Sequence, residues 1–145
     1  MVTTFAAPHL ASRLRLAVAR TARRLRQEAG GGLSPTLTSA LASIEHHGPL
    51  TPSELADRER VKRPTATRLI GTLEEQGLVV RASDPTDLRS SLISITPEGR
   101  ELMRTLRTRK DAYLVRRLAK LTADERATLA QAADLLERML EEDDA

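Results

Sequence analysis

The sequence predicts a mainly α-helical protein that carries one small β-hairpin, an α+β fold in which helices dominate. Of its 145 residues, 40% are hydrophobic and 30% are charged, a balance typical of a folded globular chain. Only Phe5 and Tyr113 are aromatic, so the core must consist of Leu, Ala, Val and Ile, which favours packed helices. Apolar residues recur at helical spacing along most of the chain, and a β-type pattern appears only once, after Gly77.

The composition also excludes several classes of protein. The chain has no cysteine, which excludes a disulfide framework, a thiolate metal site and a thiol-based redox sensor. No apolar run approaches the roughly 20 residues of a membrane span, and the N-terminus lacks the apolar region of a signal peptide. We therefore expect a cytoplasmic protein. The scarcity of aromatic rings argues against binding of single-stranded nucleic acid, which uses them to stack bases.

The first half of the chain predicts four helices. Proline or a hydroxyl-bearing capping residue opens most of them, and glycine ends the first and the fourth. Thr51 and Glu54 form the sequence pattern of a capping box at the start of the third. The predicted helices cover residues 8–29, residues 35 to a stop at 46–49, residues 52 through 56, and residues 64–76.

The second half predicts a hairpin followed by two helices. Two short β-type runs, 78–81 and 92–95, enclose the polar segment 82–91, so we expect a hairpin with a long protruding tip. Thr96 then caps a helix of about 24 residues, which spans about 36 Å. Thr122 and Glu125 repeat the capping-box pattern at the start of the last helix.

A short helix, a polar turn, a second helix and a hairpin, in that order, form the winged helix-turn-helix arrangement that binds DNA. The second of these helices turns a cationic and hydroxyl-rich surface away from the core. Arginine can bridge O6 and N7 of guanine, and the methyl group of threonine can contact that of thymine. Outside this arrangement the same residues would be read as ordinary polar surface. The candidates on this surface are Arg63, Thr65, Thr67, Arg68 and Thr72.

Three further candidates lie on the hairpin. Arg89 lies near its apex, where the guanidinium could enter a minor groove whose negative potential attracts it. Asp87 would repel a phosphate, so we expect it to orient Arg89 or its neighbours. Arg81, at the base of the hairpin, is a candidate phosphate contact or a plain surface residue.

These residues resemble the MarR family of bacterial transcriptional regulators over essentially the whole chain. The most specific pattern is D-x-R-S followed by T-x-x-G at a fixed spacing, and it adds Ser90 to the candidate DNA contacts. Matching segments also occur in and just after the helix-turn-helix. The matching runs are Leu55-Ala56, Thr65 to Leu73, Leu73 to Val79, Asp87-Leu88-Arg89-Ser90 and Ile95-Thr96-Pro97-Glu98-Gly99.

The resemblance implies a homodimeric repressor of transcription. Residues 1–33 and 97–145 would form a helical dimerisation region and 34–96 the winged helix-turn-helix, within a single intertwined domain. The sequence agrees, because the end helices carry apolar stripes that one small head cannot cover, and obligate dimers bury more than about 2,000 Å². A two-fold dimer implies a pseudo-palindromic operator.

The resemblance also implies release from double-stranded DNA by a small aromatic or anionic effector bound between the dimerisation helices and the head. Arg20, Arg23, Arg24 and Tyr113 could line such a pocket, although each could equally serve the core or the surface. One alternative is a zinc-responsive regulator that uses His46 and His47, and another is a helical dimeric interaction module without DNA binding. No nucleophile elbow or phosphate loop appears, so we expect neither an enzyme nor a bound cofactor or metal.

Overall fold

The computed structural model describes residues 6–144. Phe5, one of the two aromatic residues, lies outside the described residues. Within the described range, six helices and one two-stranded antiparallel sheet confirm the predicted mainly helical fold. The elements, in chain order, are α1 (Ala7–Ala29), α2 (Pro35–His47), α3 (Pro52–Glu59), α4 (Arg63–Glu75), β1 (Val79–Asp84), β2 (Asp87–Ile95), α5 (Pro97–Leu118) and α6 (Ala123–Asp144).

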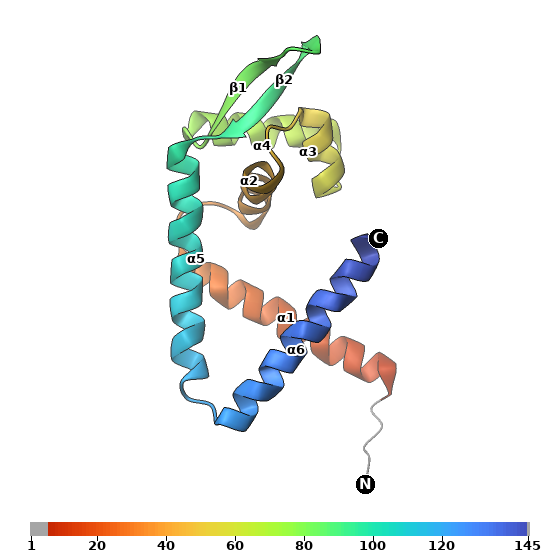
Figure 1. Cartoon of the computed structure of the whole chain (residues 1–145), viewed down its shortest axis with the longest axis vertical. Coiled ribbons are helices and arrows are strands. Elements are labelled where there is room, and N and C mark those ends of the chain that lie inside the picture. Colours follow the sequence, from red (N-terminus) through yellow and green to blue (C-terminus); the bar gives the residue numbers. More distant parts are fainter. Residues whose placement is uncertain (1–5, 145) are drawn as a thin grey trace.

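The molecule has a compact head and an open set of long helices. Helices α2, α3 and α4 and the hairpin form the head, a winged helix-turn-helix (Figure 1). Helix α5 leads away from the head, α1 packs against α5, and α6 turns back from the far end of α5. We refer to α1, α5 and α6 together as the stalk. Of the described helices, none is long and apolar enough to cross a membrane.

Local capping explains where most helices begin, as the sequence predicts. The Ser34 hydroxyl accepts the Leu37 N–H at 3.2 Å, ahead of α2. Both predicted capping boxes form, so Thr51 and Thr122 each exchange hydrogen bonds with the glutamate three residues later. These bonds satisfy amide groups that a helix N-terminus would otherwise leave unpaired.

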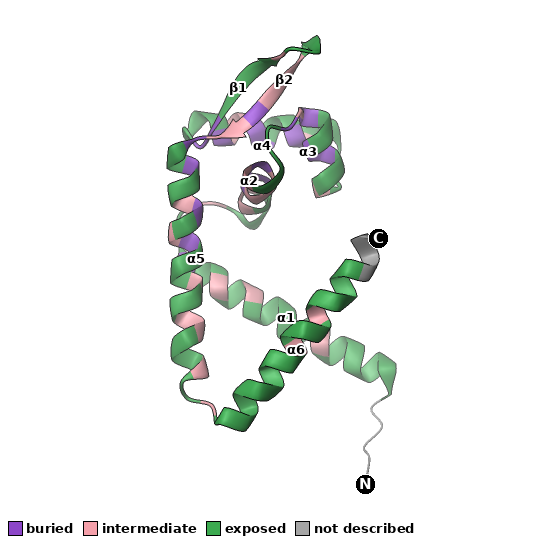
Figure 2. Ribbon diagram, viewed as in Figure 1, coloured by how far each residue is buried: buried purple, intermediate pink, exposed green. Residues whose placement is uncertain are grey.

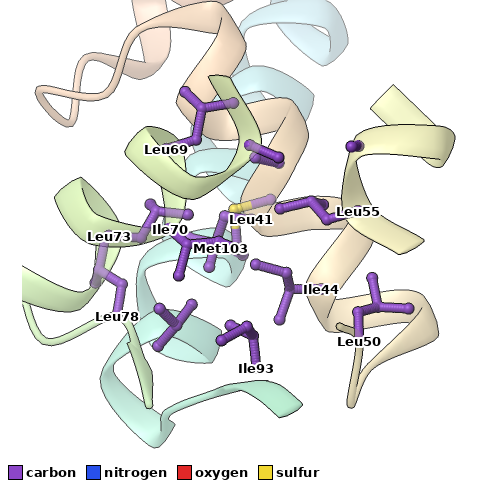
Figure 3. Close-up of a cluster of buried hydrophobic side chains, with 14 of the residues drawn as sticks. Leu41, Ile44, Leu50, Leu55, Leu69, Ile70, Leu73, Leu78, Ile93 and Met103 are labelled. Atoms are coloured by element: carbon purple, nitrogen blue, oxygen red, sulfur yellow. The ribbon is translucent and has the colours of Figure 1, made fainter. Parts of the chain in front are cut away.

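The head encloses the core of the molecule. Leu41 and Ile44 of α2, Leu55 of α3 and Ile93 of β2 are all essentially inaccessible to solvent (Figure 3). Helix α4 turns its predicted apolar face toward them. That face consists of Ala66, Leu69, Ile70 and Leu73. Met103 of α5 closes the core on the side of the stalk, which fixes the start of α5 relative to the head.

The hairpin differs from the predicted one. The strands are longer than expected, because the polar residues Ala82 and Ser83 pair with Leu92 and Ser91, and only Pro85 and Thr86 remain between the strands. The prediction that residues 82–91 separate the two strands is therefore wrong. Both faces of this finger are largely open to solvent, so its strands are held by backbone pairing and need no apolar alternation. The bounds of α4 and α5 also shift by one or two residues from those predicted, and α3 continues to Glu59 rather than ending at Ala56.

The stalk leaves its apolar stripes uncovered in a single chain. Buried residues gather in the head and at the top of α5, whereas α1 and α6 are almost entirely exposed (Figure 2). Val18 of α1 is 48% exposed, and Leu129 and Leu140 of α6 are 47% and 66% exposed. No described side chain of α6 is buried. The stalk thus presents an apolar surface that this chain alone does not cover.

Candidate nucleic-acid interface

The turn between α3 and α4 sets the angle at which α4 leaves the core. Helix α3 ends at Glu59 and is capped by Arg60, a left-handed residue with φ of 53°, whose N–H bonds to the Asp57 carbonyl at 3.3 Å. The Val61 N–H bonds to the Ala56 carbonyl at 3.0 Å, and the Val61 side chain packs against the core. This closed turn holds α4 with its apolar face inward and its polar face outward.

The outward face of α4 is cationic and carries no acid along its first two turns. Arg63, Thr67 and Arg68 are exposed, and Thr65 and Thr72 are half-buried. The Thr72 hydroxyl donates to the Arg68 carbonyl at 3.1 Å, so Thr72 offers chiefly its methyl group to a ligand. Among the described residues, none forms an ion pair with Arg63 or Arg68. Both guanidinium groups are therefore available to an external acceptor.

Gly71 leaves a shallow place on this face. A Cβ atom built at Gly71 would meet no heavy atom within 4 Å, so the helix surface is open there. A small residue at this position lets another molecule approach the backbone of α4 closely.

The tip of the hairpin is fixed by two carboxylates. Asp84 accepts hydrogen bonds from the Thr86 N–H at 2.9 Å and the Thr86 hydroxyl at 2.7 Å, and these bonds lower the pKa of Asp84. Asp87 accepts the Arg89 N–H at 3.0 Å, so it holds the backbone of the residue expected to enter a minor groove. Arg89 itself is exposed, and it forms no ion pair with another described residue.

Arg81, a candidate phosphate contact or plain surface residue, forms an ion pair with Glu74. Its Nε atom is 3.2 Å and 3.1 Å from the two carboxylate oxygens of Glu74, at the end of α4. The pair ties the base of the hairpin to α4, and it neutralises the charge that would attract a phosphate. No sequence pattern predicts this pair, since the two residues belong to different elements.

The structure thus distributes the predicted residues over two elements. Helix α4 carries one group and the hairpin carries the other, and the hairpin projects from the head as a finger (Figure 1). The α4 group is Arg63, Thr65, Thr67, Arg68 and Thr72, and the hairpin group is Arg81, Asp87, Arg89 and Ser90. Two helix-presented arginines and a finger-presented arginine provide the positive charge that a DNA backbone requires.

The stalk borders two hollows. A cleft of about 400 Å³ lies between α1, α2 and α5, and its lining combines apolar side chains with Arg26, His46, Arg107 and Lys110. Of these four, only His46 is singled out by its sequence pattern, and then as a candidate zinc ligand rather than as part of an effector pocket. A second hollow of about 300 Å³ is lined by three predicted pocket residues, Arg20, Arg24 and Tyr113, but not by Arg23. There the Arg24 guanidinium lies 5.5 Å from the centre of the Tyr113 ring.

His46 and His47 do not converge on one point. Their ring centroids are 6.4 Å apart with the planes at 63°, and the nearest carboxylate oxygen to His46, from Glu45, is 3.9 Å away. Within residues 6–144, no group of three or more histidine, aspartate or glutamate side chains is placed to hold a metal ion. The zinc-responsive alternative therefore finds no third ligand in the described part of the chain.

Comparison with known proteins supports the description of the head as a winged helix-turn-helix. Residues 33–91 match the model of the MarR family. An HTH-type transcriptional regulator from Mycobacterium leprae is 41% identical over 134 residues, which is 92% of this chain and 94% of the relative.

Two solved structures share the fold. A crystal structure of a Pseudomonas aeruginosa protein assigned as a transcriptional regulator is 37% identical, with a TM-score of 0.82 over 91% of this chain and 94% of the other. A MepR variant from Staphylococcus aureus, bound to an oligodeoxyribonucleotide, has a TM-score of 0.69 at 20% identity over 94% of this chain and 99% of the other. The head, the sequence motifs and the length of the matches agree, and the chain belongs to the MarR family of transcriptional regulators.

Proposed function

We propose that the chain acts as a homodimer that binds a pseudo-palindromic operator in double-stranded DNA, represses transcription there, and is released by a small-molecule effector. The observation that carries this proposal is the outward face of α4, whose arginines have no acidic partner among the described residues. The DNA-bound MepR variant, which has the same fold, supports it.

Base recognition would come from α4 in the major groove. Arg63 and Arg68 supply the paired donors that fit O6 and N7 of guanine, and Thr67 can contact a thymine methyl group. Thr65 and Thr72, which are half-buried, suit contacts at the edge of the helix. The hairpin would reach the adjacent minor groove through Arg89, with Ser90 as a phosphate contact and Asp87 holding the tip.

Dimerisation would bury the apolar surface of the stalk. Charge supports contact between copies, because α1 is rich in arginine whereas the described side chains of α6 include Asp124, Glu125, Asp134, Glu137 and Glu141. Two heads related by a two-fold axis would place their α4 helices in major grooves about one helical turn, or 34 Å, apart. Occupation of such a site within a promoter would exclude the polymerase, which is the simplest route to repression.

The effector would bind in the 400 Å³ cleft. Its size lies within the range of small-molecule sites, about 300–1,000 Å³, and its mixture of apolar and cationic lining suits an aromatic or other organic anion. Because α2 belongs to the head and α1 and α5 to the stalk, a ligand there would favour one orientation of the head over others. It would lower operator affinity by the difference between its affinities for the two orientations.

A mobility-shift titration with the DNA upstream of the chain's own gene tests the proposal. The logarithm of the association constant should fall with the logarithm of the salt concentration by about 0.9 for each phosphate contacted. Arg68→Ala should relax the base preference, whereas Arg104→Ala, the same change at an exposed position of α5, should not. Failure to retard any duplex would exclude DNA binding and leave the interaction-module alternative, and a binding constant insensitive to salt would contradict the phosphate contacts.

Sedimentation velocity tests the dimer. The full chain should sediment as a dimer, and Leu136→Asp on the apolar stripe of α6 should weaken association. Gln131→Asp on the opposite face of α6 is the matched control and should not. A monomeric wild-type chain would contradict the proposal.

A further inference from the structure

The tip of the hairpin presents an apolar side chain that the predicted contacts leave unused. Leu88 is 87% exposed, more than any other large hydrophobic residue of the described chain. Most other exposed apolar residues lie on the helices of the stalk, where a second copy would cover them. Leu88 lies at the other end of the molecule, beside Arg89.

A bulge in the backbone of β2 exposes the Leu88 side chain. Ser83 pairs with Ser91 and Asp84 pairs with Asp87, so residues 88–90 have no partners on the opposite strand. The turn closed by Asp84 lies before this bulge, and Asp87 accepts the N–H of Arg89 within it, so both fix its position. Bulges commonly re-aim side chains next to functional sites. The departure from regular strand alternation allows consecutive side chains to share one surface.

Leu88 and Arg89 do share a surface. Both border a hollow of about 370 Å³ along the hairpin, together with Arg81 and the hydroxyl groups of Ser83, Ser90 and Ser91. No carboxylate borders this hollow. Its lining therefore combines the Arg89 guanidinium and three serine hydroxyl groups with the apolar side chains of Leu88 and Ala82. Arg81 also borders the hollow, but its guanidinium is paired with Glu74.

That combination fits the wall of a DNA minor groove better than it fits a protein. Phosphate oxygens accept from arginine and serine, while the edges of the deoxyribose rings and the base steps are apolar. An apolar protein partner would require a larger contiguous patch than one leucine. Leucine is among the side chains that proteins place in the minor groove, where they contact or part base steps.

We propose that Leu88 is a further DNA contact of this regulator, which packs against the sugar edges and a base step of the minor groove beside Arg89. This inference rests on the proposed DNA binding. Leu88 carries no charge, so its contact displaces no counterion from the DNA. It instead favours base steps that open easily, such as TA or CA, over stiffer ones.

The salt dependence separates the two neighbouring side chains. Leu88→Ala should weaken operator binding about fivefold, because the smaller side chain buries less apolar surface against the DNA. The slope of affinity against salt concentration should not change. Arg89→Ala should weaken binding and reduce the slope by about 0.9. Val80→Ala is the matched control, because Val80 is 52% exposed on the same hairpin but does not border the hollow.

The experiment measures operator affinity for wild type and the three variants between 50 and 200 mM salt, with thermal unfolding of each variant as a check of folding. Unchanged affinity of Leu88→Ala, or a loss that also reduces the salt slope, would overturn the inference while leaving DNA binding intact. If the wild-type chain retards no duplex, the proposed function fails instead.

A second set of duplexes locates the contact in the minor groove. G·C pairs at the footprinted step under the hairpin place an amino group on the floor of the minor groove, and inosine in place of guanine removes it. The difference between wild type and Leu88→Ala should shrink on the G·C duplex and return on the inosine duplex. An equal difference on both duplexes would place Leu88 outside the minor groove and contradict the inference.

Discussion

Glu45 of α2 and Arg107 of α5 form an ion pair that joins the head to the stalk. Arg107 donates from both terminal nitrogens to the two carboxylate oxygens, and the Nη1–Oε2 distance is 3.4 Å. The Glu45 side chain is only 10% exposed, and the two residues are 62 positions apart. Arg107 also lines the cleft proposed for the effector. One guanidinium group therefore contacts both the head and the space where an organic anion would bind.

Glu45→Gln should destabilise the fold by about 1 kcal/mol at neutral pH, because the pair is half-exposed on the Arg107 side. The hydrogen bond from Arg107 lowers the pKa of Glu45 below its ordinary value of 4.5. A carboxyl group whose pKa is lower in the folded state than in the unfolded state stabilises the fold at pH values above the unfolded-state pKa. This stability is lost as the pH falls through the folded-state pKa. Urea unfolding should therefore show the two proteins converging as the pH falls below about 4.

Glu101→Gln is the control for this comparison. Its pair with Arg104 links neighbouring turns of α5, with side chains 64% and 71% exposed, so its loss should change stability by less than about 0.5 kcal/mol. If Glu45→Gln remained less stable than wild type by the same amount at low pH, the shape of the Glu45 side chain rather than its charge would account for the lost stability.

Glu74→Gln should increase affinity for DNA. Glu74 holds the Nε atom of Arg81, so its neutralisation frees a positive charge at the base of the hairpin. The salt slope should rise by about 0.9 if Arg81 then contacts a phosphate. Glu75→Gln removes the same charge from the adjacent exposed position, and an equal gain there would show a general charge effect. Mobility shifts at several salt concentrations measure both.

Thr96→Ala should destabilise the head by about 2 kcal/mol, because it removes the cap of α5 and leaves the Gly77 carbonyl without its side-chain donor. The Thr96 hydroxyl accepts the Gly99 N–H at 3.0 Å and donates to the Gly77 carbonyl at 2.7 Å, so it links the ends of α4, β2 and α5. Thr96→Ser retains the hydroxyl and should lose much less. Equal losses in urea unfolding would contradict this role.

Sequence patterns predicted features that depend on neighbouring residues. The caps at Ser34, Thr51 and Thr122, and the apolar face of α4, follow from spacings of three and four, and all are confirmed. Pairs between distant elements have no such signal. The Glu45–Arg107 and Glu74–Arg81 contacts depend on how α2 meets α5 and how the hairpin meets α4, and the pattern of one element does not encode either.

The pairing of the hairpin was also not predictable from the pattern of one element. Its polar residues 82–91 predict a connecting segment rather than strands, because strand prediction relies on apolar alternation. They pair nonetheless, since the turns at Asp84 and Asp87 align the two strands. The candidate contacts on α4 and the hairpin were recognised by residue type and motif, whereas the bulge that presents Leu88 depends on strand register alone.

The glycine of the T-x-x-G motif, Gly99, occupies a position where a side chain does not fit. A Cβ atom at this position would lie 2.4 Å from the Leu78 carbonyl oxygen and 2.7 Å from Cγ1 of Ile95. That carbonyl also accepts the Thr96 N–H at 3.0 Å, so it cannot move without breaking the junction of β2 and α5. Gly99→Ala should therefore lower the free energy of unfolding by about 2 kcal/mol.

Gly71→Ala is the matched control on the other side of the head, and it should have the opposite effect on stability. A methyl group there meets no atom within 4 Å, and alanine favours a helix interior over glycine by about 0.5–1 kcal/mol. Because the same methyl group would stand on the outward face of α4, the more stable variant should bind the operator less tightly. Urea unfolding and mobility shifts on the two variants measure both effects. Stabilisation by Gly99→Ala would show that the junction yields, and unchanged operator affinity in Gly71→Ala would place the DNA away from the middle of α4.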